Sequence, residues 1–311
     1  MADSLLTLAN LATINSRDID SDVDISLLLQ GSPLVAALPA TVASLGDSHK
    51  YAAESANSAA VFRAANAGKD YAAQTDVLKT VTLKYLDASV KYDKQVADAY
   101  IYGPEALIAQ RAASALRDAF FTIETQILSG TASDADGFAG FPNSEYMDAL
   151  ADDMCVDAGG STALSSVYGV RMDRDGVNLL VGNEGEIRIG ATREEQTLDS
   201  SSKAFNSYIT PIDAWAGMVA YGKYSVGRIA NIDDGSNKLT DNLLSSLLEQ
   251  FPGNAWPNAW VMSPRSARQL QQSRTATTST GTPAEWPTQT GAFGIPIIVS
   301  NGLGAAETQV T

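Results

Sequence analysis

Few residues of this chain could do enzyme chemistry. There is one histidine, His49, so any Ser-His-Asp or Cys-His arrangement would have to use its imidazole. His49 stands beside Lys50 between two weakly apolar segments, where a rigidly oriented base is not expected. The sequence therefore predicts no catalytic residue and no enzymatic function.

Two other patterns imitate catalytic motifs. The segment 217–223 has the glycine and lysine spacing of a phosphate-binding loop, but Tyr224 replaces the required Ser or Thr and the surroundings have the composition of a strand. Ser200 and Lys203 form a Ser-x-x-Lys pattern in a polar tract, without the buried helix that would lower the pKa of a lysine. We interpret the first as a chance match and the second as a loop.

Metal and thiol chemistry have little support either. Asp173, Asp175 and the run 233–237 supply the hard oxygen ligands that calcium prefers, yet neither set has the spacing or the terminal Glu of an EF-hand. Turn formation explains these residues, so we predict no metal and no cofactor. The single cysteine, Cys155, excludes an intramolecular disulfide and indicates a small buried thiol in a reducing compartment.

The charge balance argues against a nucleic-acid-binding protein. The chain has 21 Lys and Arg against 36 Asp and Glu, a net charge of −15, and no basic run. Affinity for a phosphate backbone comes mainly from Lys and Arg, so specific binding to DNA or RNA is not expected. The same excess charge keeps free chains apart, so any self-association must be driven by apolar burial and strand pairing.

Composition indicates a globular protein. With 311 residues and 45% hydrophobic content, the chain can bury one large core or two modest ones. Its longest apolar runs, such as 295–299, fall far short of the ~20 residues that a membrane helix needs. The N-terminus is acidic where a signal peptide is basic, which predicts a cytoplasmic product.

The first third of the chain lacks the material for an independent core. Residues 1–47 are rich in Ser, Asp and Leu and are interrupted by Pro33 and Pro39, which predicts an extended arm with a short helix at 24–29. The Ala-, Ser- and Asn-rich stretch 48–76 leads into an alternating strand at 77–92. Together these two stretches predict a long hairpin that projects from the body.

Residues 104–129 form the strongest predicted helix. Pro104 suits the first turn, Glu105 favours the positive end of the helix dipole, and Gly130 stands where a C-terminal cap is expected. At 1.5 Å per residue such a helix is ~39 Å long. The predicted buried face consists of Ala109, Ala112, Ala113, Leu116, Phe120, Ile123 and Ile127. The predicted outer face carries Arg111, Arg117, Asp118 and Glu124.

The remainder is predicted to be rich in strands. Residues 166–171 and 177–181 flank an Asp-Gly turn and predict a hairpin, and 205–232 predicts one or two long strands. The other predicted elements are an amphipathic helix at 239–250, a buried strand at 260–262, a helix at 264–272, an irregular segment at 273–291 and a final apolar strand at 294–300.

The order of these elements resembles a known family. The segment from Phe205 to Asp233, FNSYITPIDAWAGMVAYGKYSVGRIANID, resembles a long edge strand of tailed-bacteriophage major capsid proteins, and Gly294–Ser300 resembles the Gly-Ile-Pro strand that closes many of those chains. With the arm, the projecting hairpin and the 104–129 helix, these motifs resemble the Hong-Kong-phage-type capsid fold, which encapsulins share, from about residue 20 onward. In the commoner members the long strands follow the axial domain, whereas here the Trp215 strand precedes the Leu243 helix.

This resemblance implies an α+β fold of defined parts. They are an N-terminal arm (1–47), an extended loop (48–92), a mainly peripheral domain with a spine helix (93–232), and a mainly axial domain (233–311). The resemblance implies a major capsid protein of the virion, assembled in the host cytoplasm, whose shell encloses double-stranded DNA without binding it specifically. Alternatives are an encapsulin-type compartment shell and a β-rich phage tail or surface protein.

The resemblance also implies partners and contact residues. The partners are further copies of the chain, as hexamers and pentamers, a separate scaffolding protein, a portal and a decoration protein. The arm and the loop are expected to contact neighbouring subunits more than their own body. Some relatives crosslink a loop lysine to an asparagine, and Lys69 stands at that position. The candidate assembly residues are Phe62, Lys69, Asp70, Tyr71, Arg111 and Arg117.

Overall fold

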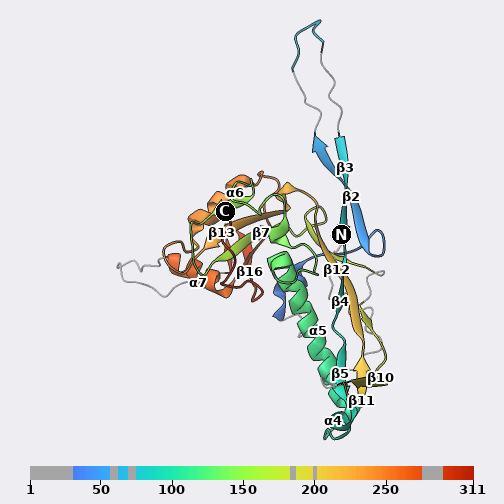
Figure 1. Cartoon of the computed structure of the whole chain (residues 1–311). Coiled ribbons are helices and arrows are strands. Elements are labelled where there is room, and N and C mark those ends of the chain that lie inside the picture. Colours follow the sequence, from blue (N-terminus) through green and yellow to red (C-terminus); the bar gives the residue numbers. More distant parts are fainter. Residues whose placement is uncertain (1–30, 57–61, 69–74, 183–186, 199–201, 275–289) are drawn as a thin grey trace.

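The structure, a computed structural model, describes residues 31–56, 62–68, 75–182, 187–198, 202–274 and 290–311. Figure 1 shows a rounded lobe, an elongated limb that contains the helix α5 (Pro104–Ser129), and a hairpin that projects beyond the limb. The predicted helix at 24–29, most of the hairpin tip at 68–70 and most of the segment 273–291 lie outside the described residues.

The lobe is built on a six-stranded mixed sheet in the order β15-β16-β14-β7-β13-β6. Helices α6 (Asp241–Gln250) and α7 (Pro264–Ser273) belong to the same lobe (Figure 1). Its strands are β6 (Cys155–Asp157), β7 (Ser165–Val170), β13 (Val226–Ile232), β14 (Ala259–Met262), β15 (Gly291–Ala292) and β16 (Ile295–Val299). Strand β7 lies antiparallel between β13 and β14, whereas β6 and β16 run parallel to their neighbours β13 and β14.

The limb combines α5 with two smaller sheets. One has the order β1-β8-β12-β4, with β9 paired to β12, and the other has the order β10-β11-β5. Their strands are β1 (Ala40–Val42), β4 (Lys84–Asp87), β5 (Val90–Asp93), β8 (Val177–Val181), β9 (Arg188–Ile189), β10 (Arg193–Leu198), β11 (Ala204–Thr210) and β12 (Ile212–Ala220). Pro211 separates β11 from β12, and the chain passes there from one sheet to the other. Short helices α3 (Pro33–Ala37) and α4 (Lys94–Asp98) complete the limb.

Helix α5 has the predicted bounds. Of the residues predicted on its buried face, Ala112, Leu116, Phe120, Ile123 and Ile127 are buried, while Ala109 and Ala113 are half-buried. Pro104 opens its first turn, and Gly130 ends it with φ of 57°. A Cβ at Gly130 would lie 1.9 Å from Asn143 Oδ1, the oxygen that accepts the Thr131 N–H, so only glycine fits this C-cap. Phe120 and Ile123 are buried and, with Leu86 and Ala214, line the contact between α5 and the β4–β12 sheet.

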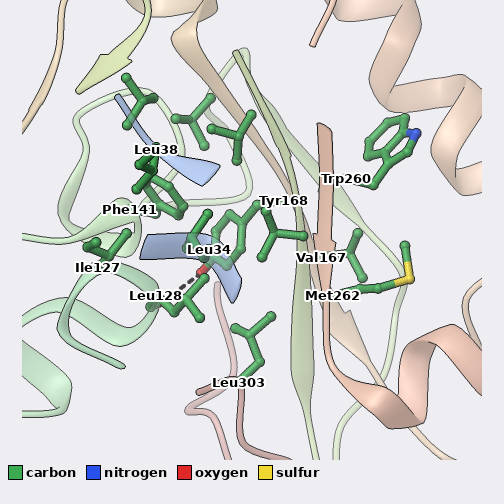
Figure 2. Packing of buried hydrophobic residues seen from close by; sticks show 14 of the residues in the cluster. Leu34, Leu38, Ile127, Leu128, Phe141, Val167, Tyr168, Trp260, Met262 and Leu303 are labelled. Atoms are coloured by element: carbon green, nitrogen blue, oxygen red, sulfur yellow. Dashed lines mark hydrogen bonds between the residues drawn. The ribbon is translucent and has the colours of Figure 1, made fainter. Parts of the chain in front are cut away.

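One continuous core joins the lobe to the limb. Trp260 and Tyr168 are wholly buried in the lobe, and the Tyr168 ring lies 5.2 Å from that of Phe141 (Figure 2). Tyr168 Oη donates to the backbone oxygen of Leu128 at the end of α5, 3.2 Å away. Because this buried hydroxyl is satisfied by the helix, the helix and the lobe sheet are fixed to each other.

Several element predictions are confirmed. The chain forms the 104–129 helix, the amphipathic helix before Pro252, the buried strand around Trp260 and the strand after Gly294. The projecting hairpin is also present as β2 (Ser48–Ala56) and β3 (Thr75–Thr82), which pair antiparallel.

The predicted hairpin of 166–171 with 177–181 is wrong. The Asp173 to Gly176 turn forms, with Gly176 N donating to Asp173 O at 3.1 Å, but β7 joins the lobe sheet and β8 joins the limb sheet. Both strands are buried along their whole length, so their sequences lack the alternation that marks a shared exposed face. The segment 205–232 likewise contains three strands, not one or two, because Pro211 and the 223–225 turn interrupt it.

The prediction that residues 1–47 lie mainly against neighbours is wrong for the described part of that segment. Leu34, Val35 and Leu38 have no exposed surface and belong to the chain's own core. Strand β1 pairs parallel with β8. The segment 34–38 between the two prolines is a short apolar run, and its buried side chains enter a core that other segments supply.

Two predicted boundaries also need correction. The hairpin ends at Thr82 rather than at 92, because β4 and β5 pair with β12 and β11 of the limb. The boundary between 232 and 233 divides the lobe sheet, which takes β6, β7 and β13 from before it and β14 and β16 from after it. Strand pairing between distant segments set these limits, and no local composition change marks them.

Candidate assembly surfaces

The projecting hairpin exposes large apolar side chains. Its strands β2 and β3 form a separate two-stranded sheet, and an isolated hairpin of this kind is only marginally stable in water. Phe62 is fully exposed, and Leu78 is 64% exposed. We call Phe62, Val77 and Leu78 the hairpin surface. Covering such side chains with another chain would contribute ~25 cal/mol for each Å² of apolar area removed from water.

A second apolar surface lies at the opposite end of the limb (Figure 1). Helix α4 is capped by Asp93, whose Oδ1 accepts the Gln95 N–H at 2.9 Å, and it leads through a turn into α5. Val96, Ile101 and Tyr102 are 65%, 84% and 76% exposed, and we call them the limb-end surface. Sequence reasoning missed it, although an apolar pair just before Gly103-Pro104 was a signal that could have been used.

The candidate residues named from the sequence lie on different elements. Phe62 is part of the described segment 62–68 at the far end of the hairpin, while Arg111 and Arg117 are exposed on α5. Phe121 on the same helix is 39% exposed. Lys69, Asp70 and Tyr71 lie outside the described residues. Among the described candidates, the structure therefore does not bring Phe62 together with Arg111 and Arg117 in one subunit (Figure 1).

The prediction that Glu124 lies on the outer face of α5 is wrong. Its side chain has no exposed surface, and its Oε2 accepts the backbone N–H of Leu34 at 2.8 Å and of Val35 at 3.2 Å. Ser300 donates its hydroxyl to Oε1. Burial raises the pKa of this carboxyl, and the three hydrogen bonds oppose that shift. Glu124 thus fixes the start of α3 and the end of β16 to the spine helix.

A second, partly buried polar network fixes the C-terminal segment. Glu307 accepts Ser166 N–H at 3.0 Å, Ser166 Oγ at 2.6 Å and Arg228 Nη2 at 3.2 Å. Arg228 is nearly fully buried and lies over the Tyr168 ring, 5.9 Å from its centroid. No local sequence pattern indicates this pairing, since Glu307 lies 79 residues from Arg228 and 141 residues from Ser166.

The residues considered for catalysis have other surroundings. Gly217 lies inside β12, and Lys223 forms an ion pair with Asp153. Ser200 lies outside the described residues. His49 stands on β2 with its Nε2 3.2 Å from Tyr221 Oη, among aromatic rings rather than beside a nucleophile.

The aspartates considered for calcium take part in turns. Asp173 accepts the Arg171 Nε–H at 2.6 Å and the Asp175 N–H at 3.1 Å. Asp233 Oδ1 accepts the N–H groups of Gly235 and Asn237 at 2.8 and 2.9 Å. Within the described ranges, no three His, Cys, Asp or Glu side chains are placed to hold a metal ion.

Two further observations concern the single cysteine and the length of the helices. Cys155 is buried as predicted, and burial raises the pKa of its thiol to about 11. Among the helices of the described segments, none combines the length and the apolar character needed to cross a membrane.

Comparison with known proteins gives fold relatives only. No protein-family model and no curated protein matches the chain. A chain in the structure of bacteriophage Epsilon15 is 16% identical with a TM-score of 0.68, covering 100% of this chain and 99% of that one. The bacteriophage JBD30 capsid is 11% identical with a TM-score of 0.53, covering 94% and 98%. The holo-SrpI encapsulin complex of Synechococcus elongatus PCC 7942 is 12% identical with a TM-score of 0.42, covering 67% and 90%.

The first two matches run across the lobe, the limb and the hairpin alike, since they span nearly all of both chains. The α+β fold predicted from the order of the sequence motifs, that of tailed-bacteriophage capsid proteins, is thereby confirmed.

Proposed function

We propose that this chain is a major capsid protein, the subunit that self-assembles into the icosahedral head shell of a bacteriophage. The observation that carries this proposal is the exposure of large apolar side chains at both ends of an elongated subunit, on the hairpin surface and on the limb-end surface. A second chain packed over these side chains would remove their apolar area from water, which favours association. The fold shared with the JBD30 capsid supports the same assignment.

In this proposal each part of the subunit has a structural role. The limb with α5 corresponds to a peripheral domain, the lobe to an axial domain near the capsomer centre, and the hairpin to an extended loop that reaches a neighbour. Residues 33–42 attach the N-terminal arm to the body of the subunit, because α3 packs into the core and β1 pairs with β8. The role is structural, without catalysis or a cofactor.

The proposed partners follow from that role. The subunit forms hexamers and pentamers and works with a separate scaffolding protein, a portal and a decoration protein. The shell encloses double-stranded DNA without specific binding, as expected for a chain with a net charge of −15. Assembly takes place in the host cytoplasm, and the product is part of the virion.

Electron microscopy of the purified, concentrated protein tests this proposal directly. We expect closed icosahedral particles, and particles isolated from producing cells should protect DNA from nuclease. Particles filled with protein cargo instead of DNA would favour an encapsulin-type shell. Fibres, or a protein that remains monomeric at every concentration, would contradict a shell subunit.

A double variant tests the limb-end surface. Ile101→Ser with Tyr102→Ser should leave the circular dichroism and the unfolding midpoint of the subunit unchanged, because both side chains are exposed. Closed shells should be lost. Gln110→Ser, at another exposed position of the limb, is the matched control and should assemble normally. Normal shells from the double variant would remove this surface from the proposal.

A further inference from the structure

The projecting hairpin is joined to the body through a small set of contacts at its base. Leu83, between β3 and β4, donates its N–H to Asp47 O at 2.8 Å. Tyr51 Oη donates to the backbone oxygen of Ala220 at 3.4 Å. A small cluster of Leu83, Leu180 and Val219, separate from the main core, packs there with Tyr51 and Tyr221. The angle between hairpin and body therefore depends on few groups.

His49 is one of those groups, and it joins three segments. Its Nδ1 accepts the backbone N–H of Ser44 at 3.3 Å, from the turn that leads into β2. Its Nε2 lies 3.2 Å from Tyr221 Oη, just beyond the end of β12. The ring stacks on Tyr51 with centroids 6.4 Å apart and meets the Tyr221 ring edge-on at 6.1 Å.

These contacts fix the protonation state of the imidazole. A backbone N–H can only donate, so Nδ1 must be without a proton to accept from Ser44. The ring proton of neutral His49 is then on Nε2 and is donated to Tyr221 Oη. A second proton, on Nδ1, would point at the Ser44 N–H and replace a hydrogen bond with two opposed donors.

We propose that His49 is a pH-sensitive latch that fixes the turn at the base of the projecting hairpin when neutral and loosens this turn when protonated. Protonation removes the hydrogen bond from Ser44 N–H, while Nε2–H can still donate to Tyr221 Oη and Lys50 N–H to Ser44 Oγ. The turn 43–47, one of the two chain connections between hairpin and body, is then held by fewer contacts. Imidazoles ordinarily gain this proton between about pH 8 and pH 5.

The other titratable groups at the hinge do not change over this range. Burial raises the pKa of both Tyr51 and Tyr221, so their hydroxyls stay neutral. Lys79 on β3 pairs with Glu145 of the body, and this hydrogen bond lowers the pKa of Glu145, so the ion pair persists in mild acid.

The remaining charged groups lie near the same hinge. Asp47 accepts the Ser48 hydroxyl at 3.2 Å, and Lys50 follows His49 on β2. Asp175 and Arg174 lie near Tyr221, where Asp175 raises and Arg174 lowers the pKa of the Tyr221 hydroxyl. For His49, the hydrogen bond that Nδ1 accepts from Ser44 N–H requires the neutral form of the imidazole.

The latch is proposed for the unassembled subunit. Only a role of the latch in shell formation would rest on the proposed function. The test uses unassembled full-length chain with spin labels at Leu78→Cys on the hairpin and Gln110→Cys on α5, both exposed positions. The buried Cys155 thiol, with its raised pKa, remains unlabelled. Pulsed dipolar spectroscopy gives the distance distribution between the labels, and the single histidine gives one imidazole NMR signal to titrate.

We expect the distance distribution to be narrow at about pH 7.5 and to broaden or shift at about pH 5.5, with a midpoint that matches the imidazole titration. The NMR data should show the Nε2–H tautomer at the higher pH. His49→Asn, whose amide oxygen can accept from Ser44 without titrating, should keep the narrow distribution at both pH values.

Three results would overturn the latch: a distribution independent of pH in the wild-type chain, an Nδ1–H tautomer, or a pH response that persists in His49→Asn. The last would assign the response to another group, such as Glu124. If His49→Asn failed to fold, the wild-type titration alone would still decide, because the two midpoints must coincide. A working latch in a chain that never forms shells would contradict the proposed function and leave the latch standing.

Discussion

At the scale of single residues, buried charged groups decide where distant parts of the chain are held. Glu124, which is buried, and Glu307, which is partly buried and paired with the buried Arg228, each accept hydrogen bonds from segments far away in the sequence. A buried polar group without a partner costs about 1 to 3 kcal/mol, so these contacts specify the arrangement even where their net contribution is small.

Replacing Glu124 should separate its hydrogen bonds from its charge. Glu124→Leu should lower the free energy of unfolding by about 2 to 5 kcal/mol, because Leu34 N–H, Val35 N–H and the Ser300 hydroxyl lose their acceptor. Glu124→Gln retains an acceptor and should cost far less. Chemical denaturation of both variants and the wild type at one pH checks this order, and equal losses would show that the hydrogen bonds are unimportant.

The pH dependence of the same variants has a defined sign. Burial raises the pKa of Glu124 above its ordinary value of 4.5, so the folded chain binds this proton more tightly than the unfolded chain. The stabilisation is fully present below the unfolded pKa and is lost as the pH rises through the folded pKa. Wild-type stability should therefore fall relative to Glu124→Gln between acidic and neutral pH, and a difference that stays constant with pH would contradict the assignment.

The buried face of α5 can be tested with two adjacent phenylalanines. Phe120→Ala should destabilise the subunit by about 3 to 5 kcal/mol and reduce the yield of soluble protein, because it opens a cavity against the β4–β12 sheet. Phe121→Ala, at a partly exposed position, should cost less than about 1 kcal/mol. Thermal unfolding of both variants is the measurement, and an unchanged Phe120→Ala protein would mean that the face is wrongly assigned.

At the scale of elements, successive strands of the limb and the hairpin belong to different sheets, and they place the hairpin surface and the limb-end surface far from the core (Figure 1). Strands β3, β4 and β5 follow one another along the chain, yet they pair with β2, β12 and β11, in three different sheets. The hairpin and the limb-end turn lie beyond the two sheets of the limb. Both leave large apolar side chains exposed. Elements of this kind are suited to contact other subunits rather than to stabilise their own.

Deleting residues 60–74 should therefore separate folding from assembly. The remaining chain keeps both sheets of the limb and the whole lobe, so we expect a soluble subunit with unchanged stability. It should fail to close shells because the far end of the hairpin is missing. Circular dichroism and electron microscopy of the same preparation check both statements. Normal particles from the deletion variant would show that the hairpin tip is dispensable.

At the scale of the whole molecule, charge and apolar surface oppose each other. A net charge of −15 repels approaching subunits, whereas the hairpin surface and the limb-end surface favour contact. At moderate salt the repulsion extends over a Debye length of ~8 to 10 Å, and added salt shortens it.

Assembly should accordingly become easier as salt rises from low to moderate concentration, which light scattering would detect. Binding to double-stranded DNA should be undetectable near physiological salt, since contacts between phosphates and Lys or Arg weaken steeply as salt rises. Tight, salt-sensitive DNA binding by the isolated subunit, measured by fluorescence anisotropy, would contradict a shell wall that merely encloses DNA.

Local signals in the sequence were sufficient to predict several elements. Pro104, Glu105 and Gly130 mark the ends of α5, and its apolar spacing predicts the buried face, because helix caps and periodicity act within a few residues. The charge balance, the buried Cys155 and the antiparallel hairpin were also predictable. The order of the motifs was enough to predict the fold.

Only the tertiary structure decided which strands pair and which polar groups are buried. β7 and β8 are separated by a tight turn yet enter different sheets, because fully buried strands carry no alternation that would identify a partner. Glu124 looked like a surface charge from its position on α5, and the N-terminal segment that covers it is 89 or more residues away. The apolar pair Ile101-Tyr102 of the limb-end surface stands out in the sequence, but the packed chain is needed to show that it is left uncovered, because exposure depends on where distant segments lie.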